Sequence, residues 1–293
     1  MRPILTAWVA AHLGPIAGEL LVPDYGTMLS LAFILAGALT LRLGLRNGLP
    51  MRRGLLALLC VYLGALLGAR GFTVLSRVPQ AVATANGWVL FGGGLTAYGG
   101  FLGGALGGYL GLRGLRSRGF WPLADAASPA LGLGIAVVRL GCLLGGCDFG
   151  AVTDVGWAVR YPAGSLAYAA HAAAGWLGPY STESLAVHPT PLYEAALGLC
   201  LGLVALLRLR RWRDRPLSGQ IFLGTAAGYA IGRFFIELLR GDTDRGIFWG
   251  GLSTSQLTSL AVLAAIGWHL SRGAGRPERT GPPPAAQLAP EPG

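Results

Sequence analysis

Charged residues are scarce in this sequence, and lysine is missing altogether. Only 12% of the 293 residues are charged, whereas 53% are hydrophobic. In soluble globular proteins about a quarter of the residues are charged. The deficit excludes an ordinary soluble protein, so lipid must be the solvent for most of the chain.

Several catalytic sequence patterns are also missing. The chain contains no HExxH string, no P-loop string and no Ser-His-Asp constellation. Metalloprotease chemistry, nucleotide use and hydrolysis by a nucleophilic serine therefore lack their parts. We expect no cofactor.

The four cysteines say little about redox conditions. Cys60 and Cys200 lie in apolar runs, where packing is the simplest role. Cys142 and Cys147 are spaced unlike any common zinc pattern, and no histidine stands at metal-ligand spacing from them. We predict no metal site, and a disulfide between Cys142 and Cys147 stays open.

The apolar runs are long enough to cross a bilayer, which takes about 17 to 25 residues of helix. They cover residues 25–41, 54–75, 89–112, 122–145, 189–207, 217–239 and 252–271. The sequence therefore predicts an all-α membrane protein with seven transmembrane helices. We expect one transmembrane domain over residues 1–271.

The arginines are distributed unevenly between the loops. A net charge of +10 would suggest nucleic acid for a soluble domain, but here most arginines follow alternate runs, at Arg42, Arg46, Arg52, Arg53, Arg113, Arg116, Arg118, Arg208, Arg210, Arg211, Arg213, Arg215, Arg272, Arg276 and Arg279. Cytoplasmic loops retain positive charge. We therefore expect the N-terminus outside, the C-terminus inside and no nucleic-acid partner. The opposite loops carry most of the acids, at Glu19, Asp24, Asp148, Asp154, Glu183, Asp242 and Asp244.

The two ends of the chain differ in composition from the runs. Residues 1–22 begin like a signal peptide, but Glu19 interrupts the apolar part and no small-residue cleavage site follows. We interpret this stretch as an external amphipathic segment. The Pro-, Gly- and Ala-rich tail at residues 272–293 is predicted to be disordered and cytoplasmic.

Ionisable residues inside the apolar runs are the strongest functional signal. Such a residue faces the bundle interior or a wet cavity, because its insertion costs a few kcal/mol. Arg139 is one case, and the string HPTPLYE at 188–194 is another. In the string RFFIELLRGD, Arg233, Glu237 and Arg240 recur at i, i+4 and i+7, which predicts one helix face. Asp242 follows where that helix is expected to end.

Each cluster alone could be structural, with Arg233 and Glu237 as a buried ion pair between helices and Arg139 hydrogen-bonded to backbone carbonyls. The predicted topology favours a common site, because it places Arg139, Arg233 and the string 188–194 at the same outer level. Several arginines with few competing carboxylates, in a partly dry pocket, bind an anionic group, and guanidinium matches phosphate bidentately. A phospholipid head group is the phosphate available at that level.

The third run contains two glycine ladders at four-residue spacing. Ladders of small residues let helix backbones approach closely, and close packing is the simpler interpretation. Near the outer end, Tyr98, Gly99 and Gly100 could also leave room for a lipid head group.

Four strings occur in one order: FGGGLTAYGGFLGG, VVRLGCLLGGCDFG, HPTPLYE and YAIGRFFIELLRGD. Together they resemble the successive signatures of the prolipoprotein diacylglyceryl transferase family of the bacterial inner membrane. PDYGTMLSLAF at 23–33 and GAR at 68–70 resemble the first two helices of that family. The resemblance covers about residues 23–271.

The resemblance implies a reaction as well as a fold. The lipobox cysteine of a prolipoprotein signal peptide would attack the glyceryl carbon of phosphatidylglycerol, giving a thioether and glycerol 1-phosphate. Arg139 matches the arginine that binds phosphatidylglycerol, and Arg233 matches a second essential arginine. The other matching positions are His188, Tyr193 and Glu194 in one string and Glu237, Arg240 and Asp242 in another. Residues 148–187 would form the periplasmic head.

Four positions depart from familiar members of that family. Tyr98 stands where a histidine is proposed to help deprotonate the cysteine, and a tyrosine with a pKa near 10 is a poor base unless arginines lower that pKa. Cys142 replaces an asparagine, Cys147 an acidic residue and Pro191 a glutamine. The base therefore stays open. An alternative also stays open, namely a paralogue that binds or transports anionic lipid without this reaction.

Overall fold

The structure is a computed structural model that describes residues 1–14, 22–48, 50–84, 86–87, 97–114, 120–211, 217–241 and 251–273. Its long helices are α3 (Tyr25–Arg46), α4 (Met51–Thr84), α5 (Ala97–Gly114), α6 (Phe120–Gly145), α8 (Thr190–Arg211), α9 (Gln220–Leu238) and α10 (Thr254–Gly273). Two short helices are α1 (Arg2–Leu13) and α7 (Leu166–Ala173). The described part contains no β-strand beyond isolated bridges, which confirms the all-α class.

Every predicted run coincides with a long helix, although the described part of α5 begins only at Ala97. Within the described residues, five helical segments are long and apolar enough to cross a membrane: α3, Met51–Leu75 of α4, α6, α8 and α9. This supports a multi-pass membrane protein. The predicted external segment contains α1, and the predicted tail lies outside the described residues after Gly273.

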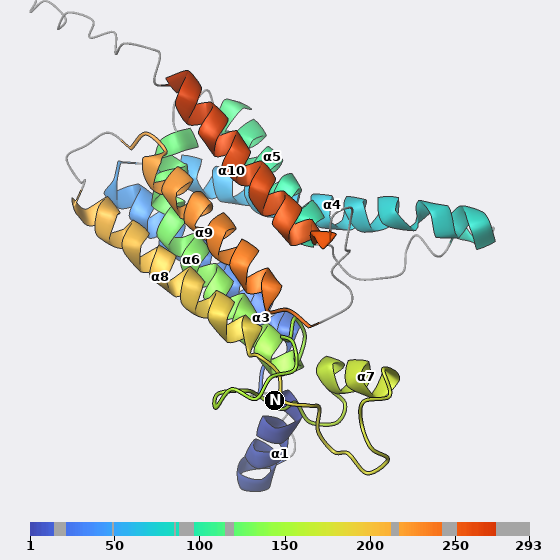
Figure 1. Ribbon diagram of the computed structural model, residues 1–293. Coiled ribbons are helices and arrows are strands. Elements are labelled where there is room, and N and C mark those ends of the chain that lie inside the picture. The colour runs from blue at the N-terminus through green and yellow to red at the C-terminus, as the bar shows by residue number, and fades with distance from the viewer. Residues whose placement is uncertain are drawn as a thin grey trace, which may run out of the picture.

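Helix α6 is the centre of the bundle (Figure 1). It packs against α3, α8 and α9, while α10 packs on α9 and α4 pairs with α5. Small residues permit the closest of these contacts. A Cβ added to Gly132 of α6 would come within 2.6 Å of the Gly202 Cα on α8, so the two backbones pass close to each other.

The glycine ladder of α5 packs against α4. A Cβ at Gly103 would meet the backbone of Gly64 and Gly68, and one at Gly107 would meet the backbone of Cys60. The structure therefore confirms close packing for the lower glycines of the ladder. Both helices carry small residues at matching four-residue intervals, which explains the fit.

A buried carboxylate fixes the start of α9. Asp125 of α6 is 1% exposed and accepts hydrogen bonds from the backbone N–H groups of Gly219 and Phe222, both at 2.8 Å. Gly219 has φ +89° and supplies no side-chain cap of its own. Asp125 therefore caps α9 from a neighbouring helix, where a negative charge also favours the helix N-terminus.

The segment between α6 and α8 lies beyond one end of the bundle, together with α1 and α7 (Figure 1). It has a small core of its own, made of Phe149, Tyr161, Ala167 and Val187. Two backbone bonds also attach it to the residues that follow α9: Ala151 N–H donates to the Leu239 carbonyl at 2.7 Å, and Gly241 N–H donates to the Phe149 carbonyl at 3.2 Å. The polar stretch 148–187 is thus an ordered cap over this end of the bundle.

Candidate active site

Three guanidinium groups and three carboxylates form one ion-pair network at the end of the bundle next to this cap. The arginines are Arg139, Arg233 and Arg240, and the carboxylates are Asp148, Glu194 and Glu237. They come from α6, α8, α9 and the residues that follow α6 and α9. Segments separated by about a hundred residues therefore meet at one place.

The guanidinium group of Arg139 bridges two carboxylates. Its Nη1 lies 2.7 Å from Asp148 Oδ2, and its Nη2 lies 2.7 Å from Glu194 Oε1. The two nitrogens of a planar guanidinium have a fixed separation, so two partners fix the orientation of the plane. The Arg139 side chain remains 18% exposed. Its two partners therefore do not enclose it completely.

Glu194 joins α6, α8 and α9. This residue is 2% exposed. Its Oε1 forms an ion pair with Arg139 and accepts a hydrogen bond from the Tyr229 hydroxyl at 2.5 Å. Arg233 Nε lies farther from the same oxygen, at 3.7 Å. Ionised buried carboxylates require such partners. The sequence string 188–194 therefore supplies an anchor for both arginines.

Arg233 and Glu237 form the ion pair that the i, i+4 spacing predicts. Arg233 Nη1 lies 2.5 Å from Glu237 Oε2, and Glu237 is 2% exposed. Arg233 Nη2 also donates to the Ser255 hydroxyl at 3.1 Å, which reaches α10. Arg233 is consequently held by three helices.

Arg240 does not lie on the helix face predicted for it. Helix α9 ends at Leu238, because the Leu239 carbonyl and the Gly241 N–H pair with residues 149–151 of the cap. Arg240 instead forms an isolated bridge with Gly150, and its Nη2 lies 2.6 Å from Asp148 Oδ1. The prediction of one helix face for all three residues was wrong for Arg240, although its charge joins the same network.

Asp148 connects Arg139 to Arg240. It has a positive φ of 55° without being glycine, a conformation that aspartate tolerates better than most residues. Burial by itself would raise the pKa of its carboxyl, but Arg139 and Arg240 outweigh burial and hold the pKa below its usual value. Asp148 is therefore ionised at neutral pH.

His188 and Tyr193 form a second polar group beside the network. Tyr193 Oη lies 3.2 Å from His188 Nδ1 and accepts a 2.6 Å hydrogen bond from Trp157 Nε1. The backbone of His188 also pairs with Gly150 and Ala151. These residues fasten the cap to the start of α8.

The two cysteines near the network are free thiols. Cys142 is buried and donates to Asp148 Oδ2 at 3.2 Å. Cys142, Cys147 and Asp148 bring their ligand atoms within 4.8 Å of one another, but both oxygens of Asp148 already accept from arginines. The carboxylate serves the ion-pair network.

Four predicted positions lie elsewhere or outside the described part. A Cβ at Gly99 or Gly100 would first meet atoms of α4, so the structure places both at the α4–α5 contact. The backbone of Tyr98 belongs to α5, but its side chain and all of Asp242 lie outside the described residues. Their roles stay predictions.

The charge balance differs from the one expected. Few competing carboxylates were predicted, but the described network pairs its three arginines with three carboxylates. An anion bound here must therefore accept hydrogen bonds from guanidinium N–H groups that do not already donate to the carboxylates. A guanidinium has five N–H donors, and the described contacts of Arg139 with carboxylates use two of its nitrogens.

Comparison with known proteins assigns the family. The family model for prolipoprotein diacylglyceryl transferase matches residues 11–271. This chain belongs to the prolipoprotein diacylglyceryl transferase family.

Curated relatives with the same name align over most of their length. The phosphatidylglycerol–prolipoprotein diacylglyceryl transferase 2 of Clostridium perfringens is 30% identical, over 86% of this chain and 90% of its own. The corresponding protein of Geobacter sulfurreducens is 30% identical, over 86% and 92%. That of Vibrio vulnificus is 31% identical, over 89% and 90%.

In this member of the diacylglyceryl transferase family, three residues that contact the site arginines or their carboxylate partners were not predicted as site residues. Asp148 was counted only among the loop acids, and Tyr229 and Ser255 are polar groups that carry no charge to attract attention. Tyr229 precedes Arg233 by four residues, so helical spacing could have placed it on the same face. No signal in the sequence pairs Ser255 with Arg233.

Proposed function

We propose that this chain transfers the diacylglyceryl group of phosphatidylglycerol to the lipobox cysteine thiol of prolipoproteins. The sulfur attacks the glyceryl carbon next to the phosphate ester oxygen, forming a thioether as the C–O bond breaks. Glycerol 1-phosphate leaves, and the thiol proton passes to a base and then to solvent. The family match supports the reaction class, and the ion-pair network supports the place where it occurs.

The observation that carries this proposal is the fork of Arg139 between Asp148 and Glu194. A fixed guanidinium plane can align a phosphodiester against an incoming thiolate, and alignment contributes much of the rate of such displacements. Positive groups placed where the leaving oxygen gains charge stabilise the transition state. We assign phosphate binding to Arg139 and charge stabilisation to Arg233.

The other site residues support these two arginines in our proposal. Glu237 holds Arg233 at 2.5 Å, and Arg240 holds Asp148 at 2.6 Å. His188, Tyr193 and Glu194 place the cap and the two arginines relative to one another. Tyr98 is our candidate for assisting deprotonation, with Gly99, Gly100 and Asp242 beside the substrate.

We place the site at the periplasmic side of the bacterial inner membrane. The arginine-rich loops then face the cytoplasm, residues 148–187 form a periplasmic head that receives the precursor, and seven helices cross the bilayer. A reporter fused after Arg272 should be cytoplasmic, and one inserted near Thr182 should be periplasmic. Labelling from outside that reaches position 213 but not 182 contradicts this topology.

The decisive experiment detects the covalent product. The purified protein is incubated with phosphatidylglycerol and a lipobox peptide, and the peptide is examined by mass spectrometry. A mass increase of one diacylglyceryl group on the cysteine is expected, and a Cys→Ser peptide is the control. If the protein binds phosphatidylglycerol but never modifies the peptide, the transferase proposal fails.

A further inference from the structure

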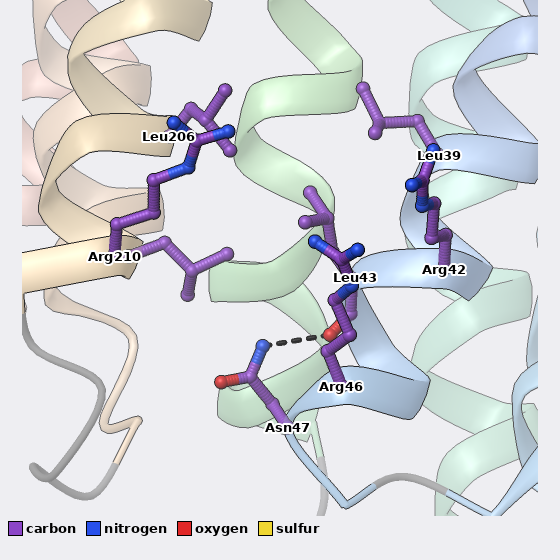
Figure 2. Close-up of a pocket in the computed structure, with 8 residues that line it drawn as sticks. Leu39, Arg42, Leu43, Arg46, Asn47, Leu206 and Arg210 are labelled. Atoms are coloured by element: carbon purple, nitrogen blue, oxygen red, sulfur yellow. Dashed lines mark hydrogen bonds between the residues drawn. The ribbon is translucent and has the colours of Figure 1, made fainter.

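A second group of arginines surrounds a cavity at the opposite end of the bundle. The cavity has a volume of about 530 Å³ and lies between α3 and α8. Figure 2 shows Arg42 and Arg46 on the α3 side and Arg210 on the α8 side. Leu39, Leu43, Leu206 and Leu209 form its apolar wall.

This cavity is separated from the candidate active site by most of the thickness of the hydrocarbon core of a bilayer. Arg210 follows Glu194 on the same helix by 16 positions, which corresponds to about 24 Å at about 1.5 Å per residue. The hydrocarbon core of a membrane measures about 30 Å. The cavity therefore lies at the level of the opposite leaflet.

The walls of the cavity arise from the way the helices pack. α3 and α8 both pack against α6, which leaves a groove between them. Leu43 and Leu209 are buried with Ala126 of α6, and Leu39 and Leu206 are half-buried against the same cluster. Asn47 closes the last turn of α3 by donating to the Leu43 carbonyl at 2.7 Å (Figure 2). The shape of the groove thus depends on a packed core.

The charge of this cavity is unbalanced, unlike that of the active-site network. Among the described residues, no carboxylate lines it, and Arg42, Arg46 and Arg210 form no ion pair with any of them. Three guanidinium groups around one space repel one another and favour an anion between them. Guanidinium matches the oxygens of phosphate, and basic pockets between transmembrane helices are typical sites for anionic head groups.

We propose that this cavity binds the phosphate head group of an anionic phospholipid from the leaflet opposite the active site. The leucine wall favours a lipid over a free phosphate ion, because it offers apolar surface where the glycerol and first acyl carbons would lie. A volume of about 530 Å³ falls in the range of ligand sites, about 300 to 1,000 Å³. A bound phosphate would connect α3 to α8 and stabilise the bundle.

The test compares two triple variants with equal charge. Arg42→Gln, Arg46→Gln and Arg210→Gln remove the cavity arginines together, whereas Arg52→Gln, Arg53→Gln and Arg211→Gln remove three arginines that are equally exposed but do not line the cavity. Phosphatidic acid is titrated into each protein in detergent, and binding is followed by native mass spectrometry and by melting temperature. This lipid carries the phosphate but is not the proposed substrate, so the result does not depend on the proposed function.

The cavity variant should bind phosphatidic acid about 100-fold more weakly than the control variant, because only Arg42, Arg46 and Arg210 line the cavity and each guanidinium beside the bound phosphate contributes roughly fivefold. Phosphatidylcholine and inorganic phosphate should stabilise neither protein. Equal binding of phosphatidic acid by the two variants overturns the site. Equal stabilisation by phosphatidylcholine overturns recognition of charge, and stabilisation by inorganic phosphate alone overturns the lipid source. Should the triple cavity variant not accumulate, Arg210→Gln against Arg211→Gln gives the same comparison with an expected difference of about fivefold.

Discussion

Replacing Arg139 by lysine tests whether the site depends on alignment or only on charge. Lysine keeps the positive charge but replaces a planar fork by a single ammonium on a flexible stem. In the structure the fork spans two carboxylates, Asp148 and Glu194, each at 2.7 Å. One ammonium at the same place cannot reproduce both contacts in that planar geometry.

The cost to stability follows from the partners that remain. Asp148 keeps Arg240 at 2.6 Å, and Glu194 keeps the Tyr229 hydroxyl at 2.5 Å. Neither carboxylate becomes an unpaired buried charge. Arg139→Lys therefore loses about one charge-assisted hydrogen bond, or roughly 1.5 to 3 kcal/mol. The variant should insert, fold and melt only a few degrees below the wild type.

The cost to the reaction should be larger than the cost to the fold. A misplacement of about 1 Å between reacting groups lowers the rate roughly 100-fold, and a point charge no longer fixes the plane in which the phosphodiester lies. We expect diacylglyceryl transfer to fall to about 1% of the wild-type rate. Product is quantified by mass spectrometry of a lipobox peptide at saturating phosphatidylglycerol.

The matched control is Arg211→Lys, an exposed arginine in the last turn of α8 at the far end of the bundle. It should transfer normally. A rate within about threefold of wild type for Arg139→Lys, when Arg211→Lys is also normal, would refute the alignment argument and leave Arg139 with a role that any cation can fill.

Further predictions concern four other carboxyl and imidazole groups. Glu237→Gln should accumulate normally and lose at least about tenfold in transfer, because Arg233 then lacks its counter-charge at 2.5 Å; unchanged turnover would make this pair purely structural. Asp148→Asn keeps a residue that tolerates the positive φ of 55°, so the fold should persist while kcat falls about tenfold and glycerol 1-phosphate inhibits more strongly; inhibition no stronger than in wild type argues against this assignment. Asp125→Asn should lower the free energy of unfolding by about 2 to 3 kcal/mol in a denaturant or thermal assay, because one of the two backbone N–H groups that donate to Asp125 would then face an amide N–H₂ donor. Asp154→Asn, at an exposed position, is the control and should be neutral. Burial lowers the pKa of His171, so as the pH falls the unfolded state binds a proton before the folded state does. The cap should therefore lose stability below about pH 6.5, and proteolysis within 148–187 should increase there. A His171→Gln variant that keeps the same pH dependence would exclude this histidine as the cause.

Much of the fold could be predicted because the bilayer imposes a simple rule on the sequence. Each predicted run coincides with a helix, since spanning segments must satisfy their backbone hydrogen bonds internally. Helix ends were predicted less well. α4 extends to Thr84. α9 stops at Leu238, because the Leu239 carbonyl and the Gly241 N–H pair with backbone groups of the cap, a contact that composition does not display.

The candidate site was predictable where charge and apolar sequence coincide. Arg139, Arg233 and Glu237 stand out in apolar runs, and the structure brings them into one network. Asp125 also lies in an apolar run but was not singled out from the sequence, and its partners are backbone N–H groups that no sequence pattern displays. Asp148 was hidden for the opposite reason, because an acid in a polar loop is ordinary until the fold turns it toward two arginines.

Among the described residues, the network has equal numbers of guanidinium and carboxylate groups, and this balance bears on how it could serve the proposed reaction. Phosphatidylglycerol carries one negative charge on its phosphodiester, and glycerol 1-phosphate carries up to two. Unpaired arginines would therefore bind the product more tightly than the substrate, and binding that persists in the product does not raise turnover. Paired arginines in a buried network keep their geometry because carboxylates hold them, as Asp148 and Glu194 hold Arg139. Their attraction for a free dianion is correspondingly reduced. We infer that the carboxylates give the site orientation and rapid product release together, and this is why removing the charge of Asp148 should strengthen product inhibition while it slows the chemical step.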